Sequence, residues 1–540
     1  MRLLPAPVGG VLCAGVFFAV TTSSARPQCE QAKLLAGDGM SNDNFSKAVA
    51  IEGAVAVIGA PNDDHAGLSA GSVHVFRRTG RVWNFEAKLT ADVNDANDQD
   101  LFGAEIDLSG EVIAVGAYGD DEASTNAGAA YVFRRVGGVW TPETKLFASD
   151  ALSNSYFGRS IALEGNVLIV GAYLADTNLF DEGAAYVFRF DGASWVEEAK
   201  LSASDGDLLD YFGFVVALSG DVALVSAYLQ DDRGVDAGIV YVFRNSGTTW
   251  TEETKLFAAD TAASDFFGQA LDIEGARIIV GAPGNNDAGP YTGSAYLFEF
   301  DGSQWVELKK LLPSDGGGTQ DIFGVAVAID GDVVVVGEPG DDSTLGNAGS
   351  AHIFRFDGVD WVFEESLVAS DVATGQLFGN NVDMDGAFML CGAYGDSELG
   401  SAAGAAYVDL YDDAVASWNN YGAGYPGTGG IPGISLDADP VIGTTVNAMI
   451  DNSFGSVTFA ILMVGIQSTS VPTSLGGTLL VIPSFLLPIQ MPSSGSSLPL
   501  EIRCNDVLIG APIFMQSIIA DPGASRGASF TPGLCMKLGF

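Results

Sequence analysis

Residues 102–118 read FGAEIDLSGEVIAVGAY, and the two words that frame this stretch, Phe102-Gly103 and Gly116-Ala117, recur along most of the chain. Phe157-Gly158 precedes Gly171-Ala172-Tyr173 with the same separation. A period near fifty residues is typical of propellers and other repeat arrays. The repeat therefore decides the fold before any local feature is considered.

Seven phenylalanines mark seven copies at spacings of 55 to 57 residues: Phe45, Phe102, Phe157, Phe212, Phe267, Phe323 and Phe378. Each copy holds four short apolar segments, rich in β-branched and aromatic residues and bounded by turn residues, which is the pattern of strands. In the third copy these are residues 157–163, 167–171, 184–189 and 195–201. The sequence predicts an all-β fold, a seven-bladed β-propeller with four-stranded blades. Six copies carry a tryptophan at one position, which predicts packing between blades: Trp83, Trp140, Trp195, Trp250, Trp305 and Trp361.

The ring is expected to close through the N-terminal strand. The seventh copy ends after its third strand, residues 405–408, and no fourth strand follows at the usual spacing. The chain begins with an unassigned fourth-strand segment, Ala32-Lys33-Leu34, ahead of Phe45. Docking of this segment on blade seven would pair an edge that is otherwise open.

These words resemble the FG-GAP repeat, the unit of the seven-bladed propeller in integrin α-subunits, over roughly residues 30–413. Three copies depart from the pattern by one residue, with Ser46, Ser226 and Glu338 in place of the usual glycine or alanine. The resemblance implies the propeller fold.

The family's calcium loops do not carry over to this chain. Integrin-like repeats often hold calcium in an acidic loop between the first and second strands. Here that connection is a tight turn, as at Glu164-Gly165 and Asp330-Gly331. Such turns suit a hairpin and leave no room for several oxygen ligands.

The sequence divides into four segments. Residues 1–25 are predicted to be a secretory signal peptide, with Arg2 before an apolar run and small residues at the cleavage position. Residues 26–413 form the propeller, 414–433 a glycine-rich linker, and 434–540 a small C-terminal β-sandwich-like domain. The protein is expected to be secreted, extracellular or at the cell surface, without a transmembrane helix. The C-terminal domain is predicted to serve attachment, sorting or ligand contact, with a disulfide between Cys504 and Cys535.

The charge is strongly negative, with 68 acids against 24 bases and a net charge of −44. Residues 418–540 contain six acids and three bases, so the propeller holds nearly all of the excess. Nucleic acid is disfavoured as a partner because its phosphates would be repelled. Direct binding to an anionic membrane is disfavoured for the same reason.

The acids gather in two kinds of loop, before each Phe-Gly word and after each Gly-Ala word, which a meander places on one face of the ring. Clusters of carboxylates suit a hard cation such as calcium, although no cofactor is required by this interpretation. The alternative is that the acids keep a secreted protein soluble. The candidate cation ligands are the paired acids Asp63, Asp64, Asp120, Asp121, Asp231, Asp232, Asp341 and Asp342.

Catalytic motifs are absent from the sequence. The chain has three histidines, of which His74 and His352 stand where other copies have tyrosine, and both are expected to be structural. No nucleophile elbow, phosphate-binding glycine loop or zinc motif occurs. We predict no enzymatic activity, but a binding or adhesion protein whose acidic loop face contacts an extracellular protein or glycan. The alternatives are a structural component of an extracellular matrix or cell envelope and, with less support, a carbohydrate-active enzyme using loop carboxylates. No oligomeric state is predicted.

Overall fold

The computed structural model describes residues 30–80, 82–91, 98–176, 179–247, 249–314, 316–411, 417–440, 445–475, 477–501 and 512–537. Within these ranges the chain consists of strands and connecting loops, without an α-helix. The described residues therefore contain no helix that is long and hydrophobic enough to span a membrane. The signal peptide predicted at residues 1–25 and Cys504 lie outside them, so that peptide and the disulfide to Cys535 stay predictions.

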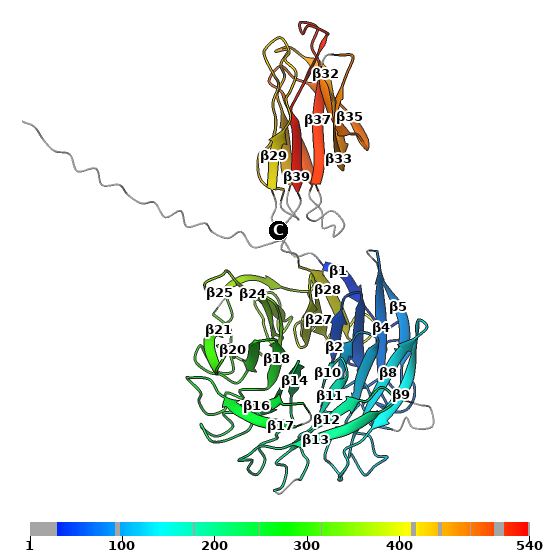
Figure 1. Cartoon of the computed structure of the whole chain (residues 1–540), viewed down its shortest axis with the longest axis vertical. Coiled ribbons are helices and arrows are strands. Elements are labelled where there is room, and N and C mark those ends of the chain that lie inside the picture. Colours follow the sequence, from blue (N-terminus) through cyan, green and yellow to red (C-terminus); the bar gives the residue numbers. More distant parts are fainter. Residues whose placement is uncertain are drawn as a thin grey trace, which may run out of the picture.

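Seven four-stranded antiparallel sheets surround a common centre, which confirms the predicted seven-bladed propeller (Figure 1). Blades one to three contain β2 (Val49–Glu52), β3 (Val55–Ala60), β4 (Ser72–Thr79), β5 (Val82–Leu89); β6 (Glu105–Ser109), β7 (Val112–Ala117), β8 (Ala129–Val136), β9 (Val139–Leu146); β10 (Ser160–Glu164), β11 (Val167–Ala172), β12 (Ala184–Phe190) and β13 (Trp195–Leu201). Blades four to six contain β14 (Val216–Ser219), β15 (Val222–Ala227), β16 (Ile239–Asn245), β17 (Trp250–Leu256); β18 (Ala270–Glu274), β19 (Arg277–Ala282), β20 (Ser294–Phe300), β21 (Trp305–Leu311); β22 (Ala326–Asp330), β23 (Val333–Glu338), β24 (Ser350–Phe356) and β25 (Trp361–Leu367).

Blade seven combines the two ends of the propeller sequence. It contains β26 (Val382–Asp385), β27 (Phe388–Ala393) and β28 (Ala405–Leu410), and its fourth strand is β1 (Glu30–Leu34). β1 pairs antiparallel with β28, with Lys33 opposite Tyr407 and Leu34 opposite Ala406. The predicted closure of the ring by the N-terminal strand is confirmed.

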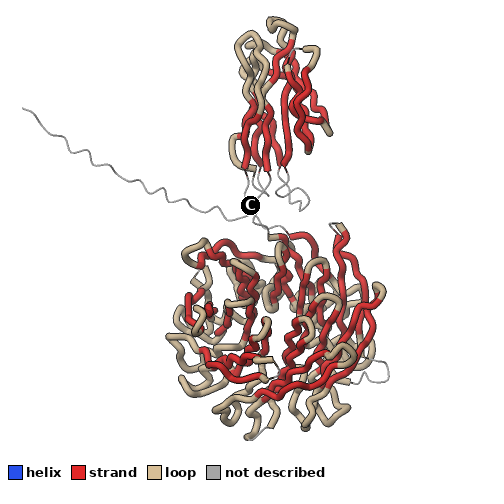
Figure 2. The backbone as a smooth tube through the Cα atoms, in the orientation of Figure 1, coloured by secondary structure: helices blue, strands red, loops and turns tan. Residues whose placement is uncertain are grey.

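Burial within a blade follows the order of its strands. The second strand is buried along its whole length, as in β7, β11 and β23. The third strand is also buried over its first five residues, because neighbouring blades cover both of its faces there. The fourth strand is buried at its two ends and partly or fully exposed between them, as an outer strand with one face toward water is. Figure 2 shows the strands of the blades joined by loops at their ends.

Large rings fill the space between blades. The seven phenylalanines that mark the copies are at most 1 % exposed. Phe157 packs edge-to-face on Tyr186 of β12, with ring centroids 5.6 Å apart. Trp195 packs into a core shared by blades two and three, and Trp250 into the core of blades three and four, as predicted. Such edge-to-face pairs add to the burial of area that holds the blades together.

Tight turns on one face, which we call the hairpin face, connect the first and second strands. In blade three Glu164 pairs directly with Val167, which confirms the predicted tight turn. The last side chain of each first strand also accepts a hydrogen bond from the turn glycine of the next blade. This contact occurs at all seven junctions, with Glu52, Ser109, Glu164, Ser219, Glu274, Asp330 and Asp385 as acceptors.

The opposite face, which we call the loop face, carries the connections between second and third strands and those between blades, as predicted. The two kinds of loop meet at a glycine and an anchor phenylalanine, for example Gly128 with Phe157 and Gly183 with Phe212. A Cβ at Gly128 would lie 2.0 Å from the Phe157 carbonyl oxygen. Only glycine allows this approach and the positive φ of 82° at the same position.

The C-terminal domain is the predicted β-sandwich. One sheet contains β29 (Ser417–Tyr421), β39 (Gly533–Lys537), β37 (Pro512–Ala520), β32 (Thr458–Gly465), β35 (Phe485–Met491) and β38 (Ala528–Phe530). Smaller sheets contain β30 (Ile434–Leu436), β31 (Thr445–Ile450), β36 (Ser496–Glu501), β33 (Gln467–Pro472) and β34 (Thr478–Ile482). Apolar side chains of β30 and β31 form one core with those of β32 and β37, as two sheets packed face to face do.

The glycine-rich stretch 414–433, predicted as a linker, is largely part of this domain. β29 pairs with β39, and the Tyr425 N–H donates to the Phe530 carbonyl oxygen at 2.9 Å. A Cβ at Gly427 would lie 2.2 Å from a carboxylate oxygen of Asp521. The linker prediction is wrong for residues 417–433, because glycine there permits close packing and not flexibility.

Candidate functional site

Six blades place a lysine of the fourth strand among carboxylates of the loop face. In blade two, Lys145 Nζ lies 2.7 Å from Asp120 Oδ2 and 2.7 Å from Glu122 Oε2. It also lies 5.0 Å from the ring centroid of Tyr131, whose hydroxyl donates to Asp120 Oδ2 at 2.9 Å. We call this arrangement the lysine cluster of the blade. The equivalent lysines are Lys33, Lys88, Lys200, Lys255 and Lys310.

The first acids of two predicted cation pairs belong to these clusters. Asp63 is buried and lies 2.6 Å from Lys88 Nζ, and it accepts a hydrogen bond from the Ser72 hydroxyl. Burial alone would raise the pKa of Asp63, but the hydrogen bonds from Lys88, Ser72 and His65 lower it below its ordinary value. Asp63 and Asp120 therefore already bind a cation, the ammonium group of the chain itself.

The acids directly after the Asp63, Asp120 and Gln230 positions stabilise their own loops. Asp64, Asp121 and Asp231 each accept a hydrogen bond from the backbone N–H five residues later, at 2.5–2.7 Å. Each of those later residues, Ser69, Asn126 and Asp236, has a positive φ between 48° and 55°. The carboxylates fix a turn that side chains rarely adopt unaided.

The remaining predicted ligands are not equivalent to these. In blade four Gln230 occupies the position of Asp120, so Asp231–Asp232 is shifted by one residue relative to the other pairs, and the Asp232 N–H donates to Gln230 Oε1. In blade six Asp341 is buried, whereas Asp342 is exposed. The eight acids lie in four different blades and do not form one common site. Calcium binding stays a prediction.

A polar cavity of about 560 Å³ lies along the ring axis, lined by the first strands of the blades. Its residues include one position that changes from blade to blade, two residues after the anchor phenylalanine. The repeat pattern alone did not predict this set, although the sequence carries a signal for it: this is the one position near Phe-Gly at which no residue type repeats. Its members are Lys47, Ala104, Arg159, Phe214, Gln269, Val325 and Asn380.

Charged groups line the cavity between blades one, two and three. Arg159 Nη1 lies 3.9 Å from Glu105 Oε2, and its guanidinium carbon lies 4.4 Å from the ring centroid of Phe214. Burial raises the pKa of Glu105 to about 7. Burial, together with the charge of Arg159, lowers the pKa of Lys47.

Three further carboxylates of the cavity hold neighbouring blades together. Asp107 accepts hydrogen bonds from the backbone N–H groups of Leu108 at 2.7 Å and of Leu163, in the next blade, at 2.6 Å. Asp272 and Asp383 bridge blades five to six and seven to one in the same way. Burial raises the pKa of Asp107 to about 7 and that of Asp272 to about 6.

Half-buried aromatic rings form an arc on the loop face over blades two to five. Tyr156 stacks on Tyr173 at 5.9 Å between ring centroids, and Tyr173 contacts both Tyr211 and Phe214 edge-to-face at 5.3 and 5.6 Å. The ring centroids of Phe214 and Tyr228 are 4.2 Å apart. Phe214 lines the axial cavity as well, so the arc is continuous with its wall. The arc comprises Tyr118, Tyr156, Tyr173, Tyr211, Phe214, Tyr228 and Phe266.

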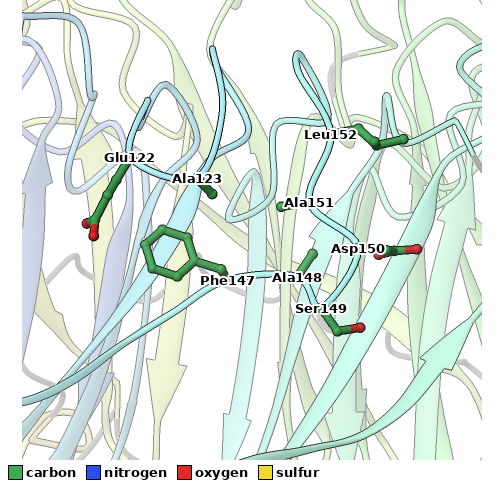
Figure 3. A pocket seen from close by; sticks show the side chains of 8 residues that line it. All are labelled: Glu122, Ala123, Phe147, Ala148, Ser149, Asp150, Ala151 and Leu152. Carbon is green, nitrogen blue, oxygen red and sulfur yellow. The ribbon is translucent and has the colours of Figure 1, made fainter.

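A second depression, of about 490 Å³, lies between loops of blades two and three (Figure 3). Figure 3 shows the ring of Phe147 on the side of Glu122, whereas the Asp150 carboxylate points to the opposite side. Both carboxylates are engaged, Glu122 with Lys145 and Asp150 with Lys200. The axial cavity with its aromatic arc is therefore the better candidate site.

Comparison with known families gives seven matches to the sequence model described as FG-GAP repeat. The matched residues are 29–76, 83–133, 140–188, 195–243, 250–298, 305–354 and 361–408. No curated protein matches the chain.

Solved structures similar to the chain match it at low identity. The β-propeller domain of the Trilobed protease from Pyrococcus furiosus has a TM-score of 0.35 and 10% identity, over 64% of this chain and 90% of that one. An exo-β-1,3-galactanase from Phanerochaete chrysosporium has a TM-score of 0.28 and 8% identity, over 95% and 100%. A mutant Trypanosoma rangeli sialidase has a TM-score of 0.33 and 11% identity, over 80% and 90%. These values support no argument about activity.

Proposed function

The chain belongs to the FG-GAP repeat family, and on that premise we propose that it is a non-enzymatic, extracellular binding protein. Its ligand is a glycan, bound at the loop face where the aromatic arc meets the axial cavity. The N-terminal sequence supports export, since residues 1–25 have the pattern of a signal peptide. Binding residues concentrate on loops held by a rigid scaffold, which a ring of blades provides.

The observation that carries this proposal is the variable position two residues after each anchor phenylalanine. The anchor itself is the same residue in all seven blades, because it packs the cores. The variable position holds seven different residue types in seven blades, although all of them lie around one axis. The packing residues repeat from blade to blade, whereas the residues at this position differ. The ring therefore presents an asymmetric surface around its axis.

The chemistry of that surface suits a carbohydrate. Aromatic rings offer flat apolar faces for stacking against sugar rings, while Arg159, Gln269 and Asn380 supply donors for hydroxyl or carboxylate groups. Arg159 also lies beside Phe214, so a donor and an aromatic face occur together.

The absence of catalysis is supported by how the cavity carboxylates are used. A glycosidase needs two carboxyl groups that face the same bond. Asp107, Asp272 and Asp383 each accept one backbone hydrogen bond from the next residue of their own strand and one from the neighbouring blade. These bonds hold the carboxylates in place as structural links.

Glycan binding is tested by screening purified protein on immobilised glycans and comparing it with the double variant R159A/F214A. We expect the variant to lose binding at least about tenfold, since stacking and a charged hydrogen bond each contribute more than 1 kcal/mol. Arg134→Ala is the matched control, because Arg134, in the third strand β8, pairs with Glu143 and does not line the axial cavity. Unchanged binding by R159A/F214A would refute the site, and release of sugar products would refute the non-enzymatic role.

A second candidate, a structural component of an extracellular matrix or cell envelope, is favoured by one observation in the C-terminal domain. Strand β35 is an edge of its sheet, and its residues Phe485, Leu486 and Leu487 are 48–68 % exposed. Exposed apolar edges favour association with another surface. Fractionation of producing cells tests this candidate: the protein would be found in the envelope fraction, and F485S/L487S would release it to the medium.

A further inference from the structure

Blade six differs from the other blades in a group of residues that come from three strands but lie close together in the structure. Its fourth strand has Ser366 where the other six blades have the lysine of the lysine cluster. Its second strand ends in Glu338 where the others have alanine, and its third strand has His352 where five blades have tyrosine. The three departures meet at His352: Glu338 and His352 are buried, and the exposed Ser366 contacts the His352 ring from the fourth strand.

The side chains at this position are close together and shielded from water. His352 Nε2 lies 2.6 Å from Glu338 Oε2, and the side chains are 2 % and 1 % exposed. Asp341, which starts the following loop, is 5 % exposed. One ligand atom each of Glu338, Asp341 and His352 lies within 4.8 Å of the other two.

The same position binds a cation in the other blades. Where the loop residue equivalent to Asp341 is an aspartate, its carboxylate binds a lysine ammonium: Asp63 with Lys88, Asp120 with Lys145, and Asp396 with Lys33, at 2.6–3.0 Å. Blade six keeps this aspartate, adds a second carboxylate, and replaces the lysine by serine. Two buried carboxylates need compensating positive charge, because burial without it is costly.

The histidine is oriented to use one ring nitrogen. Ser366 Oγ lies 2.9 Å from His352 Nδ1, so that hydroxyl can accept the Nδ1 proton. In that tautomer the Nε2 lone pair faces Glu338, and the Ser350 hydroxyl lies 3.0 Å from Nε2. A second partner that fixes the tautomer is the arrangement found around metal-binding histidines.

We propose that blade six binds a first-row divalent transition metal of the zinc class through His352 Nε2 and the carboxylates of Glu338 and Asp341. An imidazole and two carboxylates suit zinc better than calcium, which takes six to eight oxygen ligands. The metal takes the place that the lysine ammonium fills in the other blades and joins β23, its following loop and β24.

The test uses the full chain, stripped with a chelator and then dialysed against Zn²⁺. We expect one zinc ion per chain by elemental analysis, and visible d–d absorption when Co²⁺ is used as the probe. The double variant E338A/S366K rebuilds the alanine and lysine of blade two, so it should fold and lose this zinc ion. Asp342→Asn, the exposed neighbour of Asp341, is the matched control and should bind zinc like the unchanged chain.

Two results would overturn the proposal. Zinc retained by E338A/S366K at the same stoichiometry would mean that surface carboxylates bind it. No zinc bound by the unchanged chain, with no Co²⁺ absorption, would mean that His352 and Glu338 form a hydrogen-bonded pair only. The second result needs no variant, so a variant that fails to fold does not protect the proposal.

Discussion

At the scale of single residues, the propeller compensates buried acid with its own lysine. Asp120 is 1 % exposed, and a carboxylate removed from water to this extent is costly unless it is paired. Lys145 and Tyr131 supply an ammonium group and a hydroxyl donor to its carboxylate. The sequence shows the acids in pairs but not the lysine that reaches them, because Lys145 follows Asp120 by a whole strand and loop. This is why the acids alone suggested a calcium site.

Replacing this lysine should be costly. Lys145→Met keeps the apolar stem but leaves Asp120 buried without its ammonium partner, so we expect a loss of about 3–5 kcal/mol in the free energy of unfolding. Lys309→Met is the control, since Lys309 pairs with Asp360 at the surface and should cost under about 1 kcal/mol. Urea unfolding followed by tryptophan fluorescence measures both. Equal losses would contradict the structural role of the cluster.

His74 should make stability depend on pH. Burial, with the charge of Lys88, lowers the pKa of His74 from 6.5 to about 4. A base whose folded-state pKa is lowered is protonated first in the unfolded chain, so stability is full above pH 6.5 and falls as the pH falls toward 4, by up to about 1.4 kcal/mol per pH unit.

His74→Tyr, the residue of five other blades, should remove this dependence. Urea unfolding of both proteins at pH 7.5, 6 and 5 measures the difference between them. The variant and the unchanged chain should diverge progressively toward pH 5. Parallel curves would show that His74 does not titrate as described.

At the scale of elements, the sequence repeat correctly predicted the features that depend on local sequence pattern, namely the strands, the blades and the closing strand. The anchor phenylalanines, the strand-rich copies and the unpaired segment 32–34 gave the blades and their closure, because each blade must satisfy the same packing and pairing needs. The residues of the axial cavity were not predicted from the sequence, because positions about 55 residues apart become neighbours only when the first strands converge on one axis. The linker was misread because Gly427 looks the same in sequence whether it bends freely or packs against Asp521.

The closing strand depends on Lys33 more than other fourth strands depend on their lysines. Lys33 Nζ pairs with Asp371, Asp396 and Glu398, and β1 has no covalent link to blade seven through a neighbouring turn. Lys33→Glu should therefore release β1, and amide hydrogen exchange along β28 should rise at least about tenfold while other blades stay protected.

Lys200→Glu is the matched control for this prediction. Lys200 holds the same position in blade three, whose four strands are continuous in sequence, and it pairs with Asp150. This change should lower global stability without local release of β13. If both variants give the same exchange pattern, the closing strand is not held by Lys33.

At the scale of the whole molecule, charge sets the response to salt. The chain carries −44, nearly all of it on the propeller, so repulsion opposes the folded ring. Raising NaCl from about 10 mM to about 500 mM shortens the screening length several-fold and should raise the melting temperature by a few degrees. Calcium chloride at matched ionic strength should give the same rise, because Asp63 and Asp120 already hold lysines. A clearly larger rise with calcium would restore the predicted calcium sites.

The closure of the ring has a consequence for how the protein is made. β1 precedes the other propeller strands in sequence, and its partner β28 follows all of them; Lys33 and Asp396 are 363 residues apart. Synthesis at about 5–20 residues per second separates their appearance by tens of seconds, during which the growing arc keeps an open edge at each end. A chain truncated before residue 405 lacks β28, the strand with which β1 pairs. The ring can therefore close only after the whole propeller has been translated, and truncated chains keep exposed strand edges.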